Sequence, residues 1–135
     1  MKYAVLFIAL LFAGCDEGSS TEEAPPILDG GETITISGKT IQVAKEDFPN
    51  SMNWDKATEA CEELGNGWRL PDKDELKAMY EQLHKQGKGN FKNDFYWSSS
   101  QGNSGNARSV NFNNGSVDGN GKNNGTQVRA VRALP

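Results

Sequence analysis

The chain is poor in the side chains that carry most enzyme chemistry. It has one histidine, His84, and two cysteines, Cys15 and Cys61. A Ser/His/Asp set needs a histidine, and His84 directly follows the apolar Leu83 at a position that we expect to face solvent. No group of residues has the spacing of a metal site. We therefore expect no catalytic residue, no metal and no cofactor.

Carboxylates are also scarce in the C-terminal part of the chain. Residues 96–135 contain a single one, Asp118, against four basic residues: Arg108, Lys122, Arg129 and Arg132. Calcium prefers about six to eight oxygens with several carboxylates, so Asp118 is too little charge even with asparagine oxygens nearby. The basic excess favours an anionic ligand, or arginines that are solvated or structural, and both alternatives stay open.

The first residues have the pattern of an exported protein. Residues 1–14 are a basic start followed by an apolar run, which is typical of a signal peptide. Small residues before Cys15 resemble the bacterial lipobox, which predicts lipidation at Cys15 and a place in the bacterial cell envelope, at the outer membrane surface. Residues 15–32 are acidic and rich in Ser, Pro and Gly, which predicts a flexible tether. An ordinary secretory signal with an incidental Cys15 is the alternative.

The chain from Cys15 onward has 13 basic and 18 acidic residues, a net charge of −5. This balance argues against a nucleic-acid partner. With Cys15 lipidated, Cys61 has no disulfide partner, and the domain rests on its core alone. Residues 33–135 are enough for one compact domain with one hydrophobic core.

The middle of the chain predicts a hairpin and two helices. Apolar residues alternate over 33–45 around Ser37-Gly38, as in a β-hairpin with one buried face. Asn53 is a candidate N-cap for a helix over 54–64 that carries Cys61 on its apolar face. A second helix follows Asp72, which forms a capping box with Glu75, and Gly87 ends it.

The last third combines polar residues with sparse apolar ones. Of the 27 residues in 101–127, which we call the polar segment, 18 are Asn, Gly, Ser or Asp. Three apolar residues, Val110, Phe112 and Val117, occur inside this segment, whereas a linker has no reason to keep such residues. Residues 95–99, 107–112 and 127–133 are strand candidates joined by long Asn/Gly connections. Connections of this length are usually functional or disordered, and the apolar residues favour a function.

Three fragments resemble a known family: GWRLPDKDEL (67–76), YWSSS (96–100) and VRAVRAL (128–134). Their order resembles the C-type-lectin-like domain of bacterial and phage surface proteins, in the branch near the formylglycine-generating enzyme. The resemblance covers about residues 33–135 and implies an α+β fold, with two helices packed on short antiparallel strands and long irregular loops.

The polar segment itself resembles the variable region of proteins diversified by a diversity-generating retroelement, where a reverse transcriptase introduces errors at adenines. Asparagine codons are adenine-rich, and their variants include Ser, Asp, Gly and Thr, the residues found here between asparagines. The resemblance implies a variable region over about 96–132. It implies that these positions vary and bind ligand: Gly102, Asn103, Gly105, Asn106, Arg108, Ser109, Asn111, Asn114, Ser116, Asp118, Asn120, Gly121, Gly125, Thr126 and Gln127.

The same resemblance implies a fixed scaffold beneath the variable positions: Trp97, Ala107, Val110, Phe112, Gly115, Val117 and Val131. Strand periodicity places Arg108 with Val110 on one face and Ser109 with Asn111 on the other. Relatives often carry a second cysteine in the closing motif, where this chain has Ala130. Formylglycine-generating relatives use paired cysteines, so this departure also argues against that activity.

These patterns predict a lipid-anchored surface protein, not an enzyme, that binds an unknown protein or glycan through the polar segment. Small polar side chains offer adaptable hydrogen bonds. The absence of aromatic residues from position 113 onward predicts weak binding by this variant. The alternatives are a non-diversified adhesin-like module, an assembly subunit of a surface structure, and a polar loop without a role. The oligomeric state stays open.

Overall fold

The computed structural model describes Leu28 and residues 30–134. The predicted signal peptide, Cys15 and most of the predicted tether lie outside the described residues. Leu28 is buried in a hydrophobic cluster, and the Glu32 carbonyl accepts a hydrogen bond from the Val43 N–H at 2.8 Å. The folded part of the chain therefore extends to the N-terminal side of Thr33.

The predicted hairpin is confirmed. It consists of β1 (Thr33–Ile36) and β2 (Lys39–Val43), which pair antiparallel with Ile34 opposite Ile41. Ser37 and Gly38 both have positive φ, 51° and 76°, the backbone geometry of a tight hairpin turn. β6 (Val131–Ala133) pairs with β2, so the sheet order is β1-β2-β6.

Both predicted helices are present with the predicted caps. α1 (Trp54–Glu62) begins after Asn53, whose side chain accepts the Lys56 N–H. α2 (Lys73–Gln82) begins after Asp72, and its capping box with Glu75 is complete. A short 3₁₀ helix, η2 (His84–Gln86), follows α2 and ends at Gly87 in the left-handed conformation. α1 stops two residues before the predicted end.

The polar segment differs from the prediction because most of it is a sheet. β3 (Phe95–Asn103), β4 (Asn106–Asn111) and β5 (Val117–Gly121) pair antiparallel in the order β3-β4-β5, which we call the polar sheet. Only short turns connect these strands. The sequence VDGNG of β5 has low strand propensity, so periodicity did not predict it, and cross-strand pairing with β4 forms the strand instead.

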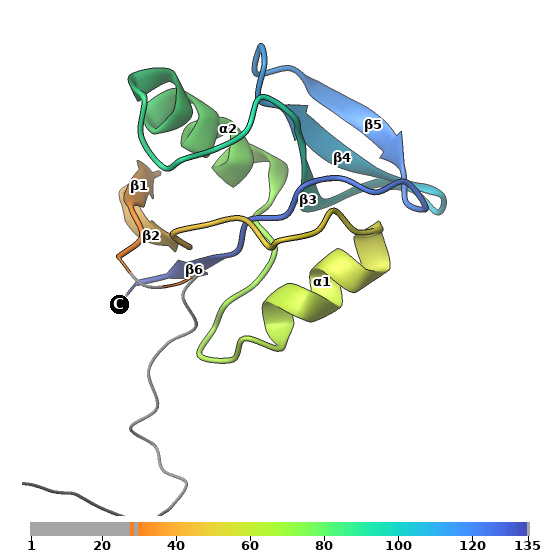
Figure 1. The fold of residues 1–135 in the computed structure, drawn as a ribbon, viewed down its shortest axis with the longest axis horizontal. Coiled ribbons are helices and arrows are strands. Elements are labelled where there is room, and N and C mark those ends of the chain that lie inside the picture. The colour runs from red at the N-terminus through yellow and green to blue at the C-terminus, as the bar shows by residue number, and fades with distance from the viewer. Residues whose placement is uncertain (1–27, 29, 135) are drawn as a thin grey trace, which may run out of the picture.

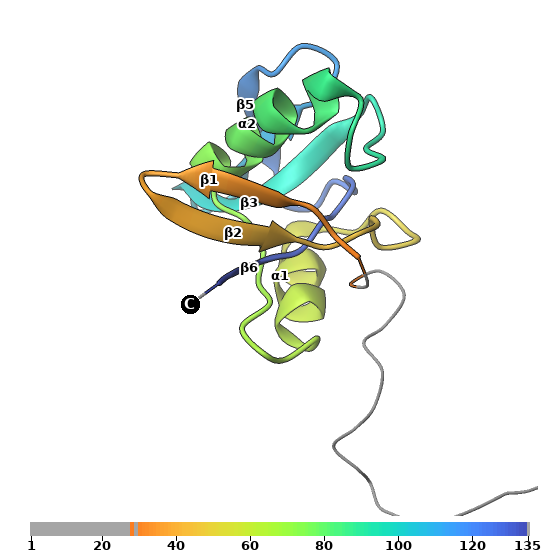
Figure 2. The ribbon, with the colours of Figure 1, turned by 90° about the vertical axis from the view of Figure 1, so that its left-hand side faces the viewer.

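The polar sheet is packed on both faces near its inner strands. One hydrophobic cluster joins α1 to the sheet through Ala57, Cys61, Trp97 and Ala107. The other cluster joins α2 and the β1-β2 hairpin to Tyr96, Val110 and Phe112. Figure 2 shows the hairpin in front of the polar sheet, with α2 above it and α1 below.

The two sheets lie on opposite sides of the domain. β1, β2 and β6 are on one side together with the first described residues and the C-terminal end, and β4 and β5 are on the other (Figures 1 and 2). Among the described residues no helix has the length and apolar character needed to cross a membrane.

Candidate binding surface on the polar sheet

The predicted scaffold positions are buried in the domain, with one exception. The buried ones are Trp97, Ala107, Val110, Phe112, Gly115 and Val131. Gly115 has φ of +81°, and a Cβ added there would lie 2.5 Å from a ring carbon of Tyr80, so only glycine fits.

Val117 is the exception, because its side chain is 39% exposed. It lies opposite Val110, but on the outer strand of the sheet, where no further strand covers it. Val117 is predicted to be a scaffold position, and the structure shows that burial in the core does not hold its side chain. Strand position, which the local sequence does not encode, decides the difference between these two valines.

The predicted variable positions lie mostly at the surface of the same sheet and its turns. Exposed positions are Gly102, Asn103, Gly105, Arg108, Asn114, Asp118 and Gly125. Half-buried positions are Asn106, Asn111, Ser116, Asn120, Gly121 and Gln127. The two that are buried are Ser109 and Thr126.

Ser109 and Thr126 do not reach the surface. Ser109 lies on the face of β4 opposite to Arg108, as predicted. That face is covered at this point, because Ser109 is fully buried opposite Trp97 of the adjacent strand β3. The Ser109 hydroxyl has no hydrogen-bond partner among the described residues. Thr126 forms an antiparallel bridge with Met52. Neither side chain can contact a ligand in this conformation.

Several asparagines of the polar segment shape its turns. The side-chain oxygens of Asn103, Asn111 and Asn114 each accept a backbone N–H two residues ahead, at 3.0, 2.9 and 2.9 Å. Such Asx turns stabilise a chain reversal locally. These positions therefore have a structural contribution that the adenine-codon pattern did not indicate, although asparagine next to glycine was a usable turn signal.

Lys122 fastens the polar sheet to α1. Its ammonium lies 4.4 Å from the centre of the Trp54 ring and donates to the Gln101 side chain at 2.6 Å. The Trp54 indole N–H donates to the Ser98 carbonyl at 2.8 Å. Lys122 is consequently engaged within the domain.

The arginines of the C-terminal part divide into structural and free ones. Arg132 packs over the Trp68 ring and donates to Gln42. Arg129 is fully buried and pairs with Asp47 at 2.8 Å. Arg108 is exposed, and no hydrogen bond or ion pair of its side chain occurs among the described residues. Of these three, only Arg108 is available to an anionic ligand.

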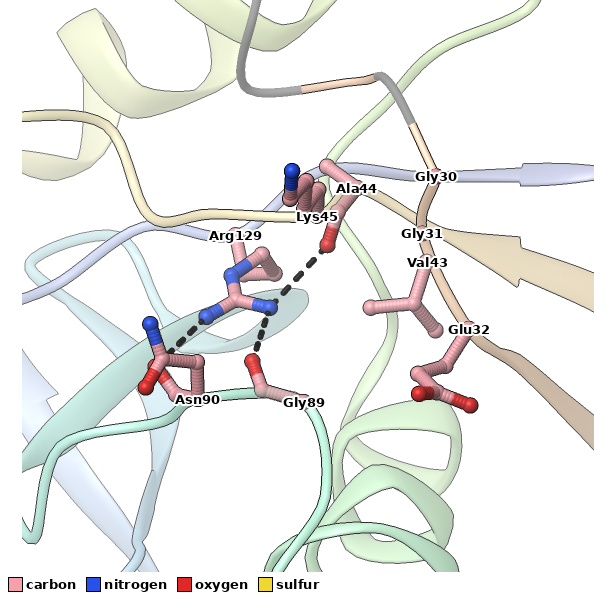
Figure 3. A pocket seen from close by; sticks show the side chains of 9 residues that line it. All are labelled: Gly30, Gly31, Glu32, Val43, Ala44, Lys45, Gly89, Asn90 and Arg129. Atoms are coloured by element: carbon pink, nitrogen blue, oxygen red, sulfur yellow. Dashed lines mark hydrogen bonds between the residues drawn. The ribbon is translucent and has the colours of Figure 1, made fainter.

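A small pocket beside Arg129 is lined by residues outside the polar sheet (Figure 3). Its volume is about 170 Å³. The Arg129 guanidinium already donates to the backbone carbonyls of Ala44, Gly89 and Asn90 at 3.0, 2.8 and 3.2 Å. None of the predicted variable positions lines it, and its polar contacts hold three chain segments together, so we regard it as a structural feature.

Cys61 is buried in the core, and His84 is packed against aromatic rings at the edge of the domain. Burial, and secondarily the charge of Glu62, raises the pKa of the Cys61 thiol to about 12, so the thiol is protonated and unreactive. His84 is half-buried rather than facing solvent: it contacts Tyr80, Phe91 and Phe112 and lies 2.7 Å from the Asn93 side-chain oxygen. No group of three His, Cys, Asp or Glu side chains that could hold a metal ion occurs in the described part of the chain.

Comparisons with known proteins define the family. The model of the family described as the Lcl C-terminal domain matches residues 33–132. No curated protein matches the chain. Among solved structures, the chain is similar to the crystal structure of botrocetin, with 14% sequence identity, a TM-score of 0.49, and coverage of 83% of this chain and 100% of that one. The chain thus belongs to the Lcl C-terminal domain family, and it has the α+β, C-type-lectin-like fold that the sequence predicted.

Proposed function

We propose that this protein is a lipid-anchored, surface-displayed binding protein of the bacterial cell envelope, and that adenine-directed retroelement mutagenesis varies its polar sheet. The ligand is a macromolecule outside the cell, and the protein performs no catalysis. The observation that carries the proposal is the division of the polar sheet between buried apolar anchors and surface polar positions.

This division makes variation cheap for the fold. Val110 and Phe112 are fully buried, whereas neighbouring positions such as Arg108 and Asp118 are exposed. Substitutions of surface side chains that lack specific contacts change stability by within about 0.5 kcal/mol. A sheet built in this way accepts many side-chain combinations at its surface while its backbone stays in place.

The surface also contains one aromatic side chain suited to an anchor role. Phe95 is 37% exposed and lies opposite Asn111 in β4. Aromatic residues frequently dominate binding energy at interfaces. Phe95 lies before the polar segment, which has no aromatic residue of its own from position 113 onward.

The arrangement of the domain supports display. The first described residues lie beside β6, whereas β4 and β5 lie on the opposite side of the domain (Figure 1). A tether and lipid anchor on the N-terminal side would therefore hold the polar sheet away from the membrane. Several acyl chains, unlike a single one, give stable membrane anchoring.

Binding by substituted full-length chains tests the proposal. Wild type, Phe95→Ala, Arg108→Ala and Asp118→Ala are applied to a glycan array and to intact bacterial cells. Thr33→Ala and Lys39→Ala change exposed residues on the opposite sheet and serve as matched controls. We expect binding that at least one polar-sheet variant weakens about fivefold or more, equivalent to about 1 kcal/mol, and that neither control alters.

Equal binding by all three polar-sheet variants would move the site elsewhere. In that case an adhesin-like or assembly subunit that uses another face becomes the better explanation.

A further inference from the structure

The outer edge of β5 is a row of unpaired backbone groups. In the β4-β5 ladder, Lys122 N–H donates to the Gly105 carbonyl and Asn111 N–H to the Ser116 carbonyl, both at 2.9 Å. Antiparallel ladders alternate, so residues 116, 118, 120 and 122 direct their backbone groups toward β4. Val117, Gly119 and Gly121 therefore direct theirs to the open edge.

This edge is accessible to a second chain. Two of its three outward residues are glycines, and Val117 and Gly119 are exposed. Among the described residues, the outward backbone groups of Val117 and Gly119 have no hydrogen-bond partner. At Gly121 the edge is closed, because its carbonyl accepts the Asn124 N–H at 3.0 Å. Figure 1 shows β5 as the outermost strand of its sheet.

The corresponding edge of the other sheet is blocked. At β1, the Gln82 side chain accepts the Thr35 N–H at 3.0 Å and donates to the Thr35 carbonyl at 2.8 Å. One amide from α2 thus occupies both outward groups of that residue, as a neighbouring strand would. Proteins commonly protect exposed strand edges in such ways, so the difference between β1 and β5 is informative.

We propose that an extended segment of a partner protein adds to the polar sheet along β5. This inference rests on the proposed function and names its partner class. Alternating N–H and C=O groups at the spacing of a strand match another polypeptide backbone, and a glycan has no such alternation. A second copy of this chain, paired through β5, is the alternative occupant of this edge, and the sedimentation measurement below distinguishes it.

Strand addition is compatible with a varied surface. Backbone hydrogen bonds supply affinity whatever side chains β5 carries, because the bonding groups belong to the main chain. Asp118 and Asn120 project from one face of β5 beside the added strand, where their side chains select among partner sequences. Variation at these positions then changes specificity without removing the basic mode of attachment.

A peptide selection with paired glycine variants tests the inference. A phage-displayed library of random peptides of about 12 residues is selected on the immobilised full-length chain. Gly119→Pro removes the outward N–H, at an edge position where proline is compatible with a strand. Gly119→Ala keeps this N–H, and its added Cβ would meet the Arg108 guanidinium at an ordinary contact distance of 3.7 Å. We expect the selected peptides to bind Gly119→Pro at least about tenfold more weakly than wild type and to bind Gly119→Ala within about threefold.

N-methylation of the selected peptide keeps the test decisive if Gly119→Pro does not fold. Methyl groups on alternate peptide nitrogens should abolish binding in one set and leave it unchanged in the other, with a period of two residues. A peptide bound through its side chains alone would lack this periodicity.

Three outcomes overturn the inference: no peptide is selected, Gly119→Pro binds as wild type does, or the chain forms a β5-dependent dimer in sedimentation. The proposed function survives them if glycan or cell binding is still weakened by Phe95→Ala, Arg108→Ala or Asp118→Ala. If peptide binding at β5 fails and the polar-sheet variants also leave glycan and cell binding unchanged, the proposed function is rejected as well.

Discussion

Arg108 and Arg129 belong to the same C-terminal third of the chain, yet their environments are opposite. Arg129 is fully buried, donates to Asp47 and three backbone carbonyls, and lies 4.1 Å from the centre of the Phe91 ring. Arg108 is exposed, without a partner among the described residues. The segment around Arg129 is therefore held in the core, whereas the polar sheet exposes side chains such as Arg108 and Asp118 to solvent. On the proposed function, stability and recognition depend on different residues of one continuous segment.

The largest expected loss of stability comes from replacing the buried arginine, Arg129. Arg129→Met removes the cationic partner of the nearly buried Asp47 carboxylate, which keeps only the Tyr96 hydroxyl as a donor, and it removes the donor to three backbone carbonyls. Removing one partner of a buried ion pair costs about 3–5 kcal/mol. We expect a loss of this size in urea denaturation, against less than about 0.5 kcal/mol for Arg108→Met. Similar losses for the two variants would mean that the environments are not distinct.

Val110 and Val117 lie opposite each other in β4 and β5, and they provide a second test of the contrast between buried and exposed residues. Val110→Ala removes two buried methyl groups and should destabilise the fold by about 2 kcal/mol. Val117→Ala should cost less than about 0.5 kcal/mol because its side chain is exposed on the outer strand. Chemical denaturation of both variants measures the difference. Equal losses of unfolding free energy for the two variants would show that Val117 belongs to the hydrophobic core.

Acid titration tests a second ion pair, between the half-buried Arg69 and the buried Glu75. Burial raises the pKa of Glu75, but hydrogen bonds from the Arg69 guanidinium and the Asp72 N–H outweigh it and hold the pKa below its ordinary value of 4.5. A lowered folded-state pKa gives stability that is complete above the unfolded-state value and is lost as the pH falls below it.

Wild type should therefore exceed Glu75→Gln in stability at neutral pH, and the gap should narrow as the pH falls through the region below 4.5. Denaturation curves at several pH values measure this gap. A gap that does not change with pH would show that the ionised carboxylate is not what stabilises this corner.

The smallest expected effect concerns Ser109, whose hydroxyl is buried without a partner among the described residues. Ser109→Ala removes an unsatisfied polar group with little change of volume, so its stability should stay within about 0.5 kcal/mol of wild type or rise slightly. A loss above about 1 kcal/mol in the same assay would indicate that this hydroxyl has a hydrogen bond.

Local signals predicted much of the fold. The Ser37-Gly38 turn, the Asn53 cap and the Asp72 capping box each depend on neighbouring residues, and all three are present. β5 was missed because its pairing with β4 is not encoded in its own composition. His84 is half-buried and not fully solvent-facing as predicted, because Phe91 and Phe112, which pack against it, come from later parts of the chain.

The candidate site was predicted to a similar extent. Alternation along β4 placed Arg108 and Val110 on one face, as the structure shows. Alternation could not show that the opposite face, with Ser109, is covered near Trp97, since burial there depends on tertiary packing. It also could not identify which strand edge is open, because Gln82 reaches β1 from another element.

The central claim, that the polar sheet is varied over a fixed scaffold, is tested most directly by the DNA that encodes it. The neighbouring genome should contain a reverse-transcriptase gene and a near-copy of the segment encoding about residues 96–132. We predict that the two sequences differ only where the copy has adenine, that the differences fall in codons for surface positions such as Arg108 and Asp118, and that codons for Trp97, Val110 and Phe112 are identical. The absence of any such copy, or differences spread over other bases and the buried codons, would contradict the account.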